Sequence, residues 1–334
     1  MTRNLITDVA GLRVGNAEDE AAISGTTVLL CDEPAVAACD IMGAAPGTRD
    51  IALLEPENTV DRIDAIFLSG GSAFGLDAGG GVQAALRESG RGFDVLGHRV
   101  PIVPGAIIFD LANGGDKNWG RVPPYWELAY RATLNVSLDF GMGSLGAGTG
   151  ALVSGLKGGL GSASARLSSG KTVGAIVVAN ATGSPVINET GHFWAAAFEK
   201  DNEFGGLGWP ARIPEGADAI ELKKRDPANP VANTTLAVVA TDAALSKAEC
   251  KRLAVSAHDG FARALWPVHT AVDGDLAFSV ATGHAGAVNS PEERIELCAI
   301  ASAVTARAIA RAVYEADALP GTPFPSWHDR FGEK

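Results

Sequence analysis

The segment that decides the fold is NTTLAVVAT, at residues 233–241. Its last six residues are apolar or β-branched, which predicts a buried β-strand. A run rich in proline and charge, from about Lys200 to Asn233, precedes it and predicts a surface loop. A loop of more than about 20 residues is uncommon within a domain unless it is functional or disordered. The bond between Asn233 and Thr234 therefore marks a change from irregular to regular structure.

Downstream of this strand, capping signals and apolar periodicity predict two helices separated by a strand. Motifs of the S-x-x-E type, which typically begin a helix, occur at Ser246 and Ser290. The expected elements are a helix over 247–265, a strand over 276–283, a helix from Pro291 to about residue 316, and a surface tail from Pro320.

Upstream of the loop, short β-branched runs bounded by glycine and proline predict most of the strands. The expected elements are two short strands within 5–15, strands over 25–31, 35–40, 63–68, 100–111 and 172–180, a helix capped by Ser72 and continuing to about Arg91, and a helix over 125–134. No internal repeat or second-domain boundary is evident, so residues 1–334 are expected to form a single domain.

A glycine-rich turn, SGGSAFGLDAGGGV at residues 69–82, connects an expected strand to an expected helix. Such a turn permits close packing of the helix on the sheet, but it is also the setting of phosphate-binding loops. Its spacing matches neither GxGxxG nor GxxxxGK[ST], and it lacks the phosphate-binding lysine. Close packing is the favoured interpretation, and a nucleotide site stays as the alternative.

Composition excludes several classes of protein. The net charge of −12 and the absence of a long Lys/Arg run argue against nucleic acid as a partner. The four cysteines show no CxxC spacing, which argues against a zinc site or a disulfide framework. The amino-terminal residues lack an apolar signal segment, and no stretch of about 20 apolar residues is uninterrupted. We expect a cytoplasmic location, no membrane span and no cofactor or metal.

Thr234 is a candidate nucleophile because it follows Asn233 at the start of a buried strand. A threonine at a new amino terminus supplies both a hydroxyl nucleophile and an α-amine that titrates near ~8 and can accept its proton. Before cleavage the same hydroxyl can attack the preceding carbonyl. Taken alone the Asn-Thr-Thr tripeptide is a weak signal, since most such tripeptides lie in turns or at strand edges.

Several motifs along the chain support this interpretation. They occur in the same order as in the DmpA-like hydrolases, which the chain resembles. That family includes L-aminopeptidase/D-esterase, β-peptidyl aminopeptidases and the endo-type nylon-oligomer hydrolase. The matching motifs are ITDV and GLRVG within 6–15, APGTR at 45–49, SGGSAFGLDA at 69–78, GAGTG at 146–150, VANATG at 178–183, NTT at 233–235 and DGD at 273–275.

The resemblance implies a fold and a set of roles. It implies an α/β (α+β) four-layer αββα sandwich similar to the Ntn hydrolases, cut into residues 1–233 and 234–334 and assembled as a homo-oligomer of processed αβ units. It implies a small peptide or amide as substrate. The implied catalytic residues are Thr234 as nucleophile, Asn180 as oxyanion donor, Lys157, and the positioning pair Asp273 and Asp275.

The chain departs from the family pattern at two positions. Phe109 stands where several relatives have an active-site tyrosine, and Asn16 stands where many have histidine. Together with Ser72, Phe109 is a candidate for the substrate pocket. Loss of the phenol donor would alter oxyanion binding or substrate choice.

Simpler explanations exist for most of these residues. Asp273 and Asp275 flank a glycine and fit an ordinary turn, Asn180 fits a turn at a strand end, and Lys157 fits a surface loop. His269 lies near the acidic pair and His192 in a polar loop, which leaves a Ser/His or metal arrangement to be considered, although no metal-binding spacing supports it.

The favoured function is a self-processing amidohydrolase or aminopeptidase that acts on N-terminal or ω-amino-acid amides through an acyl ester on the threonine. The alternatives are an acyltransferase of the ornithine acetyltransferase type, which shares the self-cleaved threonine, and an uncut homologue that binds ligands without catalysis.

Overall fold

Residues 2–223 and 233–332 are described in a computed structural model, in which the strand expected after Thr234 is β12 (Leu236–Thr241). It lies inside a nine-stranded mixed sheet of order β10-β11-β12-β13-β2-β4-β7-β3, with β1 also paired to β2. The other strands of the sheet are β1 (Leu12–Asp19), β2 (Ser24–Ile41), β3 (Thr48–Arg49), β4 (Arg62–Ser69), β7 (Gly105–Ile107), β10 (Gly159–Arg166), β11 (Thr172–Ala179) and β13 (Leu276–Ala281).

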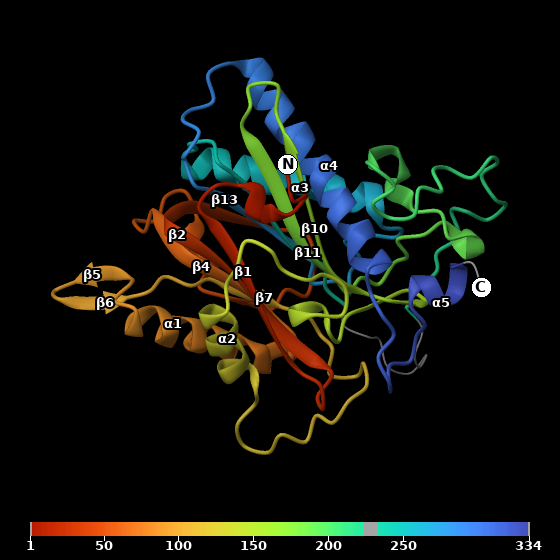
Figure 1. The fold of residues 1–334 in the computed structure, drawn as a ribbon, viewed down its shortest axis with the longest axis horizontal. Coiled ribbons are helices and arrows are strands. Elements are labelled where there is room, and N and C mark those ends of the chain that lie inside the picture. The colour runs from red at the N-terminus through yellow and green to blue at the C-terminus, as the bar shows by residue number, and fades with distance from the viewer. Residues whose placement is uncertain (1, 224–232, 333–334) are drawn as a thin grey trace.

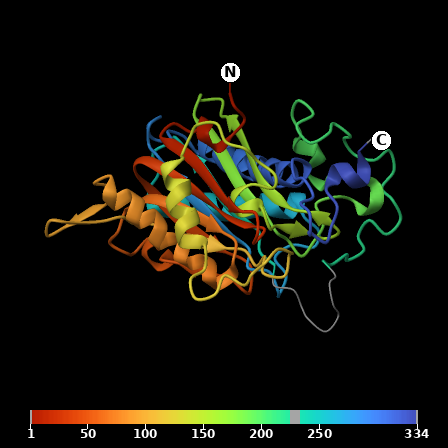
Figure 2. The same cartoon turned by 60° about the horizontal axis from the view of Figure 1, so that its bottom comes forward.

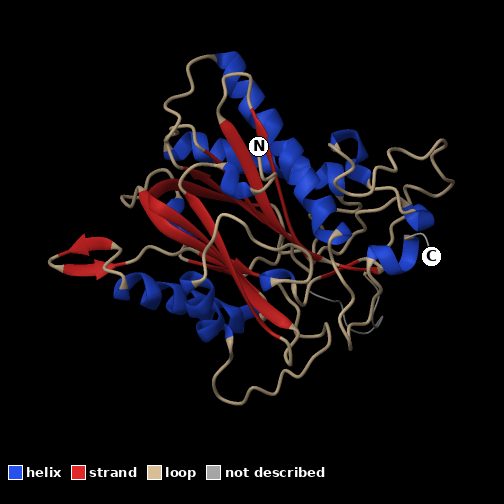
Figure 3. Cartoon of the chain, viewed as in Figure 1, coloured by secondary structure: helices blue, strands red, loops and turns tan. Residues whose placement is uncertain are grey.

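Among the described residues, two small hairpins, five α-helices and six short 3-10 helices accompany this sheet (Figures 1 and 3). The hairpins are β5 (Phe93–Val95) with β6 (His98–Val100) and β8 (Leu152–Val153) with β9 (Leu156–Lys157). The helices are α1 (Ala78–Glu88), α2 (Tyr125–Leu134), α3 (Lys247–Ala264), α4 (Pro291–Tyr314) and α5 (Trp327–Phe331).

Three buried apolar clusters separate four layers of secondary structure: a helix layer, two sheet layers and a second helix layer. One lies between α3 and α4 and the outer face of β10 to β13, and includes Val177 and Val239. The next lies between two sheet layers, where Val178 and Val238 face inward with residues of β1 and β4. The last lies beneath α1 and α2. Because successive strand residues point to opposite faces, this alternation produces an αββα sandwich, as expected (Figures 1 and 2).

β2 joins the two sheet layers and corrects the expectation of separate strands over 25–31 and 35–40. It is one strand of 18 residues, and its pairing with β4 shifts register between Leu30 and Ala35. Its first half pairs with β1 and its second half with β13. The irregularity lets one strand bend from one layer into the other, which the sequence shows only as an interruption by charged residues.

Other expectations required correction. The first expected strand within 5–15 is a 3-10 turn, η1 (Ile6–Asp8), and the strand over 100–111 is only the three residues of β7. Ser72 does not cap a helix: a 3-10 helix, η3 (Ser72–Asp77), precedes α1, and Gly71 is its cap residue. The tail is not confined to the surface, because Trp327 is 5% exposed and stacks on Phe193.

The helices after Thr234 confirm the capping signals. Ser246 accepts a hydrogen bond from the backbone N–H of Glu249 at the start of α3, and Ser290 accepts one from Glu293 at the start of α4. By length and composition α4 is the one described helix that could cross a membrane, but 72% of its apolar window is buried within the fold, as in the core helix of a globular domain.

Of the proline-rich loop expected over 200–233, the described residues 200–223 contain no helix or strand. Pro227 and Pro230, on which that expectation partly rests, lie outside the described residues.

Candidate active site

The peptide between Asn233 and Thr234 lies at the amino-terminal end of β12, where it is enclosed by other parts of the chain. The two residues are 2% and 3% exposed. The backbone N–H of Thr234 donates to the carbonyl oxygen of Asn180 at 3.0 Å. Asn180 directly follows β11, the strand that pairs with β12. Asn233 forms an isolated parallel bridge with Asp273. The long-range pairing of the sheet therefore fixes this peptide on both sides.

The carbonyl oxygen of Asn233 receives two donors. The hydroxyl of Thr234 donates to it at 2.6 Å, and the backbone N–H of Gly274 donates to it at 2.7 Å. A hydroxyl and a fixed N–H donor therefore converge on one carbonyl oxygen. Nucleophilic attack on this carbonyl group would need a hydroxyl beside it and a donor on its oxygen, and both groups are present here.

Gly274 must be glycine for this approach. A Cβ at this position would lie 2.6 Å from Oγ1 of Thr234 and 2.5 Å from the carbonyl oxygen of Ala45, both shorter than real Cβ contacts. The Ala45 backbone is itself held, since its N–H donates to the carbonyl oxygen of Asp273 (2.9 Å). The first residue of the APGTR motif at 45–49 thus packs against the turn formed by Asp273, Gly274 and Asp275.

Asp273 orients the side chain of Asn233 through Thr182. The amide nitrogen of Asn233 donates to the hydroxyl oxygen of Thr182 (2.6 Å), and that hydroxyl donates to Oδ1 of Asp273 (2.7 Å). The other carboxylate oxygen accepts from the backbone N–H and hydroxyl of Thr270 (2.9 and 2.6 Å). Asp273 is 1% exposed, and these donors replace the water that a buried carboxylate loses.

Asp275 holds the residue that follows the candidate nucleophile. Its Oδ1 accepts the backbone N–H of Thr235 at 2.6 Å, and its Oδ2 lies 2.9 Å from Nδ1 of His269. Burial raises the pKa of Asp275, the hydrogen bond from His269 lowers it, and the nearby Asp273 raises it again. Asp273 therefore contacts the residue before the candidate nucleophile through Thr182, and Asp275 contacts the residue after it.

Asn180 contacts Thr234 through its backbone, whereas its side chain points to a different set of groups. Its Nδ2 donates to the carbonyl oxygen of Phe109 (3.2 Å). Its Oδ1 accepts from the backbone N–H of Leu152 (3.0 Å) and from Nζ of Lys223 (2.9 Å). In this uncut chain the backbone donor on the Asn233 carbonyl is thus Gly274, and the side-chain amide of Asn180 instead donates to the Phe109 carbonyl.

Lys157 lies behind Asn180 and is not at the surface. It is fully buried, and its Nζ donates to the carbonyl oxygens of Gly148, Ala151 and Gly158 at 3.0, 2.9 and 2.7 Å. Burial lowers its pKa to about 7, while the charge of Asp110 raises it. Its link to the site runs through the peptide between Ala151 and Leu152, whose N–H binds Asn180.

Of the two candidate pocket residues, Phe109 contacts the site by its backbone, whereas the backbone of Ser72 binds the residue before Phe109. The carbonyl of Phe109 binds the side chain of Asn180, and the N–H of Ser72 donates to the carbonyl oxygen of Ile108 (3.0 Å). The glycine-rich turn beside Ser72 already binds a side chain of the protein itself, because the N–H of Gly71 donates to Oδ1 of the buried Asp110 (2.8 Å). This contact favours the packing interpretation of the turn over a phosphate site.

Two residues raised by the sequence lie outside this cluster. Asn16 accepts from the hydroxyl of Thr27 (2.8 Å) and donates to the carbonyl oxygen of Gly141 (3.3 Å). His192 lies 2.9 Å from the carbonyl oxygen of Gly208. Among the described residues no group of three or more His, Cys, Asp or Glu side chains is placed to hold a metal ion.

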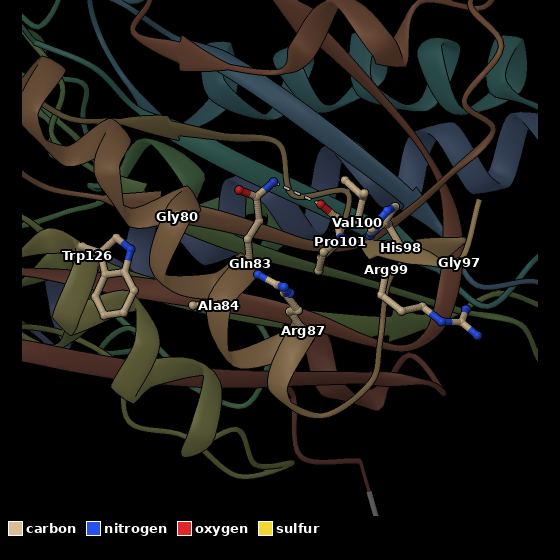
Figure 4. A pocket seen from close by; sticks show the side chains of 10 residues that line it. All are labelled: Gly80, Gln83, Ala84, Arg87, Gly97, His98, Arg99, Val100, Pro101 and Trp126. Carbon is tan, nitrogen blue, oxygen red and sulfur yellow. Dashed lines mark hydrogen bonds between the residues drawn. The ribbon is translucent and has the colours of Figure 1, made fainter. Parts of the chain in front are cut away.

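A hollow of about 670 Å³ lies elsewhere, between α1 and the hairpin of β5 and β6 (Figure 4). Its side chains include Arg87, Arg99 and Trp126, and none of the residues around the Asn233–Thr234 peptide lines it. This hollow is therefore not the candidate active site.

Sequence reasoning missed Gly274, Thr182 and Lys223. Gly274 lies within the quoted DGD motif, and Thr182 lies within VANATG. The sequence shows only a glycine and a threonine there, and neither residue type by itself indicates a backbone donor or a bridging hydroxyl. Lys223 lies in the long loop, and only the fold brings its ammonium to Asn180.

Comparison with known proteins gives the family of the chain. Residues 4–323 match the model of peptidase family S58. An uncharacterized aminopeptidase of Mycobacterium tuberculosis is 41% identical over 345 residues, which cover 98% of each chain. A 6-aminohexanoate-oligomer endohydrolase of Paenarthrobacter ureafaciens is 29% identical over 288 residues, covering 82% of this chain and 74% of the relative.

Solved structures show the same fold at lower identity. A β-aminopeptidase of Burkholderia sp. superposes with a TM-score of 0.69 at 20% identity, covering 100% of this chain and 95% of that one. The L-aminopeptidase D-Ala-esterase/amidase of Ochrobactrum anthropi, described as a variant of the Ntn hydrolase fold, has a TM-score of 0.65 at 21% identity, covering 96% and 89%.

Proposed function

The chain belongs to peptidase family S58, and we propose that it cuts itself between Asn233 and Thr234 and then hydrolyses amide bonds with Thr234 as its amino-terminal nucleophile. The observation that carries the proposal is the carbonyl oxygen of Asn233, which accepts from both the Thr234 hydroxyl and the Gly274 N–H at 2.6 and 2.7 Å.

Self-cleavage balances as an acyl shift followed by hydrolysis. Oγ1 of Thr234 adds to the carbonyl carbon of Asn233, and the Gly274 N–H stabilises the developing oxyanion. The C–N bond then breaks, the nitrogen takes a proton, and the acyl group stays on the hydroxyl oxygen as an ester. Water opens the ester, which leaves the carboxylate of Asn233 and the free amine of Thr234.

Turnover repeats the same chemistry on a substrate amide. The new α-amine of Thr234 accepts the hydroxyl proton, which passes to the leaving amine as the acyl ester forms. Water then releases the acyl group. In this proposal Asp273 and Asp275 position the nucleophile, and Asn180 supplies a further oxyanion donor once its amide turns from the Phe109 carbonyl.

The substrate class follows from the relatives. The 41% identical relative is named as an aminopeptidase, so we propose the amide after the first residue of small peptides as the main substrate. The more distant relatives act on 6-aminohexanoate oligomers by name, and such ω-amino amides are the second class to test.

A panel of L-, D- and β-aminoacyl p-nitroanilides, together with 6-aminohexanoate oligomers, tests this function. The native chain should release amine from at least one class, and Thr234→Ala should release none. An active Thr234→Ala protein would reject the proposed nucleophile.

Two alternatives predict other products. An acyltransferase would pass the acyl group from an amide donor to an added amine such as ornithine faster than to water. An uncut binding homologue would stay intact and consume no substrate. Product analysis with one donor, with and without the acceptor amine, separates these outcomes from hydrolysis.

Assembly and location are also proposals. The cut chain is proposed to form a homo-oligomer of αβ units in the cytoplasm, and light scattering of the purified protein together with cell fractionation tests both statements.

A further inference from the structure

A chain of hydrogen bonds leads from Asp275 away from the Thr234 peptide and into α3. Oδ2 of Asp275 lies 2.9 Å from Nδ1 of His269. Nε2 of His269 lies 3.3 Å from Nδ1 of His258, and Nε2 of His258 lies 3.2 Å from the carbonyl oxygen of Asp40 in β2. The side chains of His258 and His269 are 2% and 15% exposed. The proposed chemistry does not yet use either imidazole.

The positions of the protons along this chain follow from its two ends. The carbonyl oxygen of Asp40 only accepts, so Nε2 of His258 must carry a hydrogen. If His258 is neutral, its Nδ1 is then an acceptor, and Nε2 of His269 must carry a hydrogen as well. The contact with Asp275 therefore needs one proton more than two neutral imidazoles contain.

The surroundings of Asp275 place this extra proton on His269. Oδ1 of Asp275 accepts the N–H of Thr235, and Oδ2 accepts the backbone N–H of His269 (3.3 Å) in addition to its ring. Donors on both oxygens match a carboxylate better than a carboxylic acid, so the ring of His269 is the imidazolium of a buried ion pair.

Other titratable groups face the His269–Asp275 pair. Burial and the adjacent His269 together lower the pKa of His258 to about 4, although Asp40 and Asp259 raise it, so His258 is neutral near pH 7. Asp273 faces the pair from the same turn, Asp259 lies on α3, and Lys251 of α3 lies 3.4 Å from the Asp40 carboxylate.

The backbone of His269 points to a role beyond packing. Its φ is +50°, a conformation uncommon for a residue other than glycine, and strain of this kind concentrates at functional sites. In that conformation both its ring and its own N–H bind the same oxygen of Asp275.

We propose that His269 is a positioning residue of the active site, which carries the proton that holds Asp275 as a carboxylate while His258 stays neutral behind it. This inference rests on the proposed function of Thr234. Asp275 in turn binds the N–H of Thr235 and is adjacent to Gly274, the donor to the reacting carbonyl. Loss of the imidazolium should therefore allow both the Thr234–Thr235 backbone and the Gly274 donor to shift.

Nitrogen NMR of the histidine rings tests the proton positions directly. In the Thr234→Ala protein at pH 7, His269 should show both ring nitrogens protonated, and His258 a single proton on Nε2. A neutral His269 with one protonated nitrogen would overturn the proposal. This readout does not depend on catalysis, and assignment through His258→Gln and His269→Asn identifies the two rings.

Kinetics test the role in the otherwise native chain. His269→Asn keeps a donor near the position of Nδ1 but removes the charge. It should lower the rate of self-cleavage and kcat by about tenfold to a hundredfold, the range for loss of a charged hydrogen bond, with KM little changed.

His98→Asn, on the exposed hairpin strand β6, is the matched control and should match the native protein in both respects. A His269→Asn protein with native self-cleavage and native kcat would overturn the role of His269, whereas a native chain without hydrolytic activity would instead reject the function on which it rests.

Discussion

Replacing Gly274 by alanine tests the donor that the structure places on the Asn233 carbonyl. The added Cβ would lie 2.6 Å from Oγ1 of Thr234 and 2.5 Å from the carbonyl oxygen of Ala45. No φ in the left-handed region is involved at this glycine, so the conflict is one of space. Neither neighbour is the free end of a long side chain, and the turn itself must shift by several tenths of an ångström.

That shift lengthens the 2.7 Å hydrogen bond between the Gly274 N–H and the Asn233 oxygen. Removal of one oxyanion donor typically lowers a rate by about 10²–10³-fold, or roughly 3–4 kcal/mol of activation free energy. Self-cleavage of Gly274→Ala should slow by this factor, while the fold measured by circular dichroism stays native.

The assay is the intact mass of freshly purified protein followed over time. Gly141→Ala is the matched control, because its Cβ would meet only the side chain of Leu145, whose tip can move. If Gly274→Ala cleaves as fast as Gly141→Ala and the native chain, the Gly274 N–H does not stabilise the reacting carbonyl and this account of the site is wrong.

Three further predictions follow from buried contacts. Thr182→Val in the uncut Thr234→Ala background leaves Asn233 and Asp273 without their shared hydroxyl and should lower the free energy of unfolding in urea by about 1–3 kcal/mol, whereas a loss equal to that of Thr182→Ser would refute the bridge. Burial lowers the pKa of Lys157 to about 7, so the unfolded chain binds more protons above that pH, and the free energy of unfolding should rise between pH 7 and about pH 10 by up to about 1.4 kcal/mol per unit. Lys157→Met should show a flatter curve in the same range, and equal slopes for the two proteins would contradict the shift. Trp327→Ala should lower the free energy of unfolding in urea by about 3–5 kcal/mol because its ring is buried. A change near zero would show that the tail does not pack into the core.

Local sequence signals predicted much of the fold because they reflect short-range physics. The capping serines of α3 and α4 and the apolar run of β12 each depend on residues within a few positions. The bend of β2 is different, because the strand continues past the charged residues only through its pairing with β4 and β13. No local pattern carries that information.

The candidate site divides in the same way. Thr234, Asp273 and Asp275 follow from motifs, and the structure brings them together, but their catalytic roles remain predictions. The donor role of the Gly274 backbone, the buried position of Lys157 and the contact between His258 and His269 depend on segments that meet only in the folded chain. A backbone N–H in particular has no side chain by which a sequence could reveal it.

The most direct test of the central claim is the intact mass and amino-terminal sequence of the purified chain, beside Thr234→Ala. The native protein should resolve into residues 1–233 and 234–334, with threonine at the new amino terminus, and Thr234→Ala should stay whole. A native chain that persists at 34.2 kDa on incubation, or a Thr234→Ala chain cut at the same bond, would contradict it.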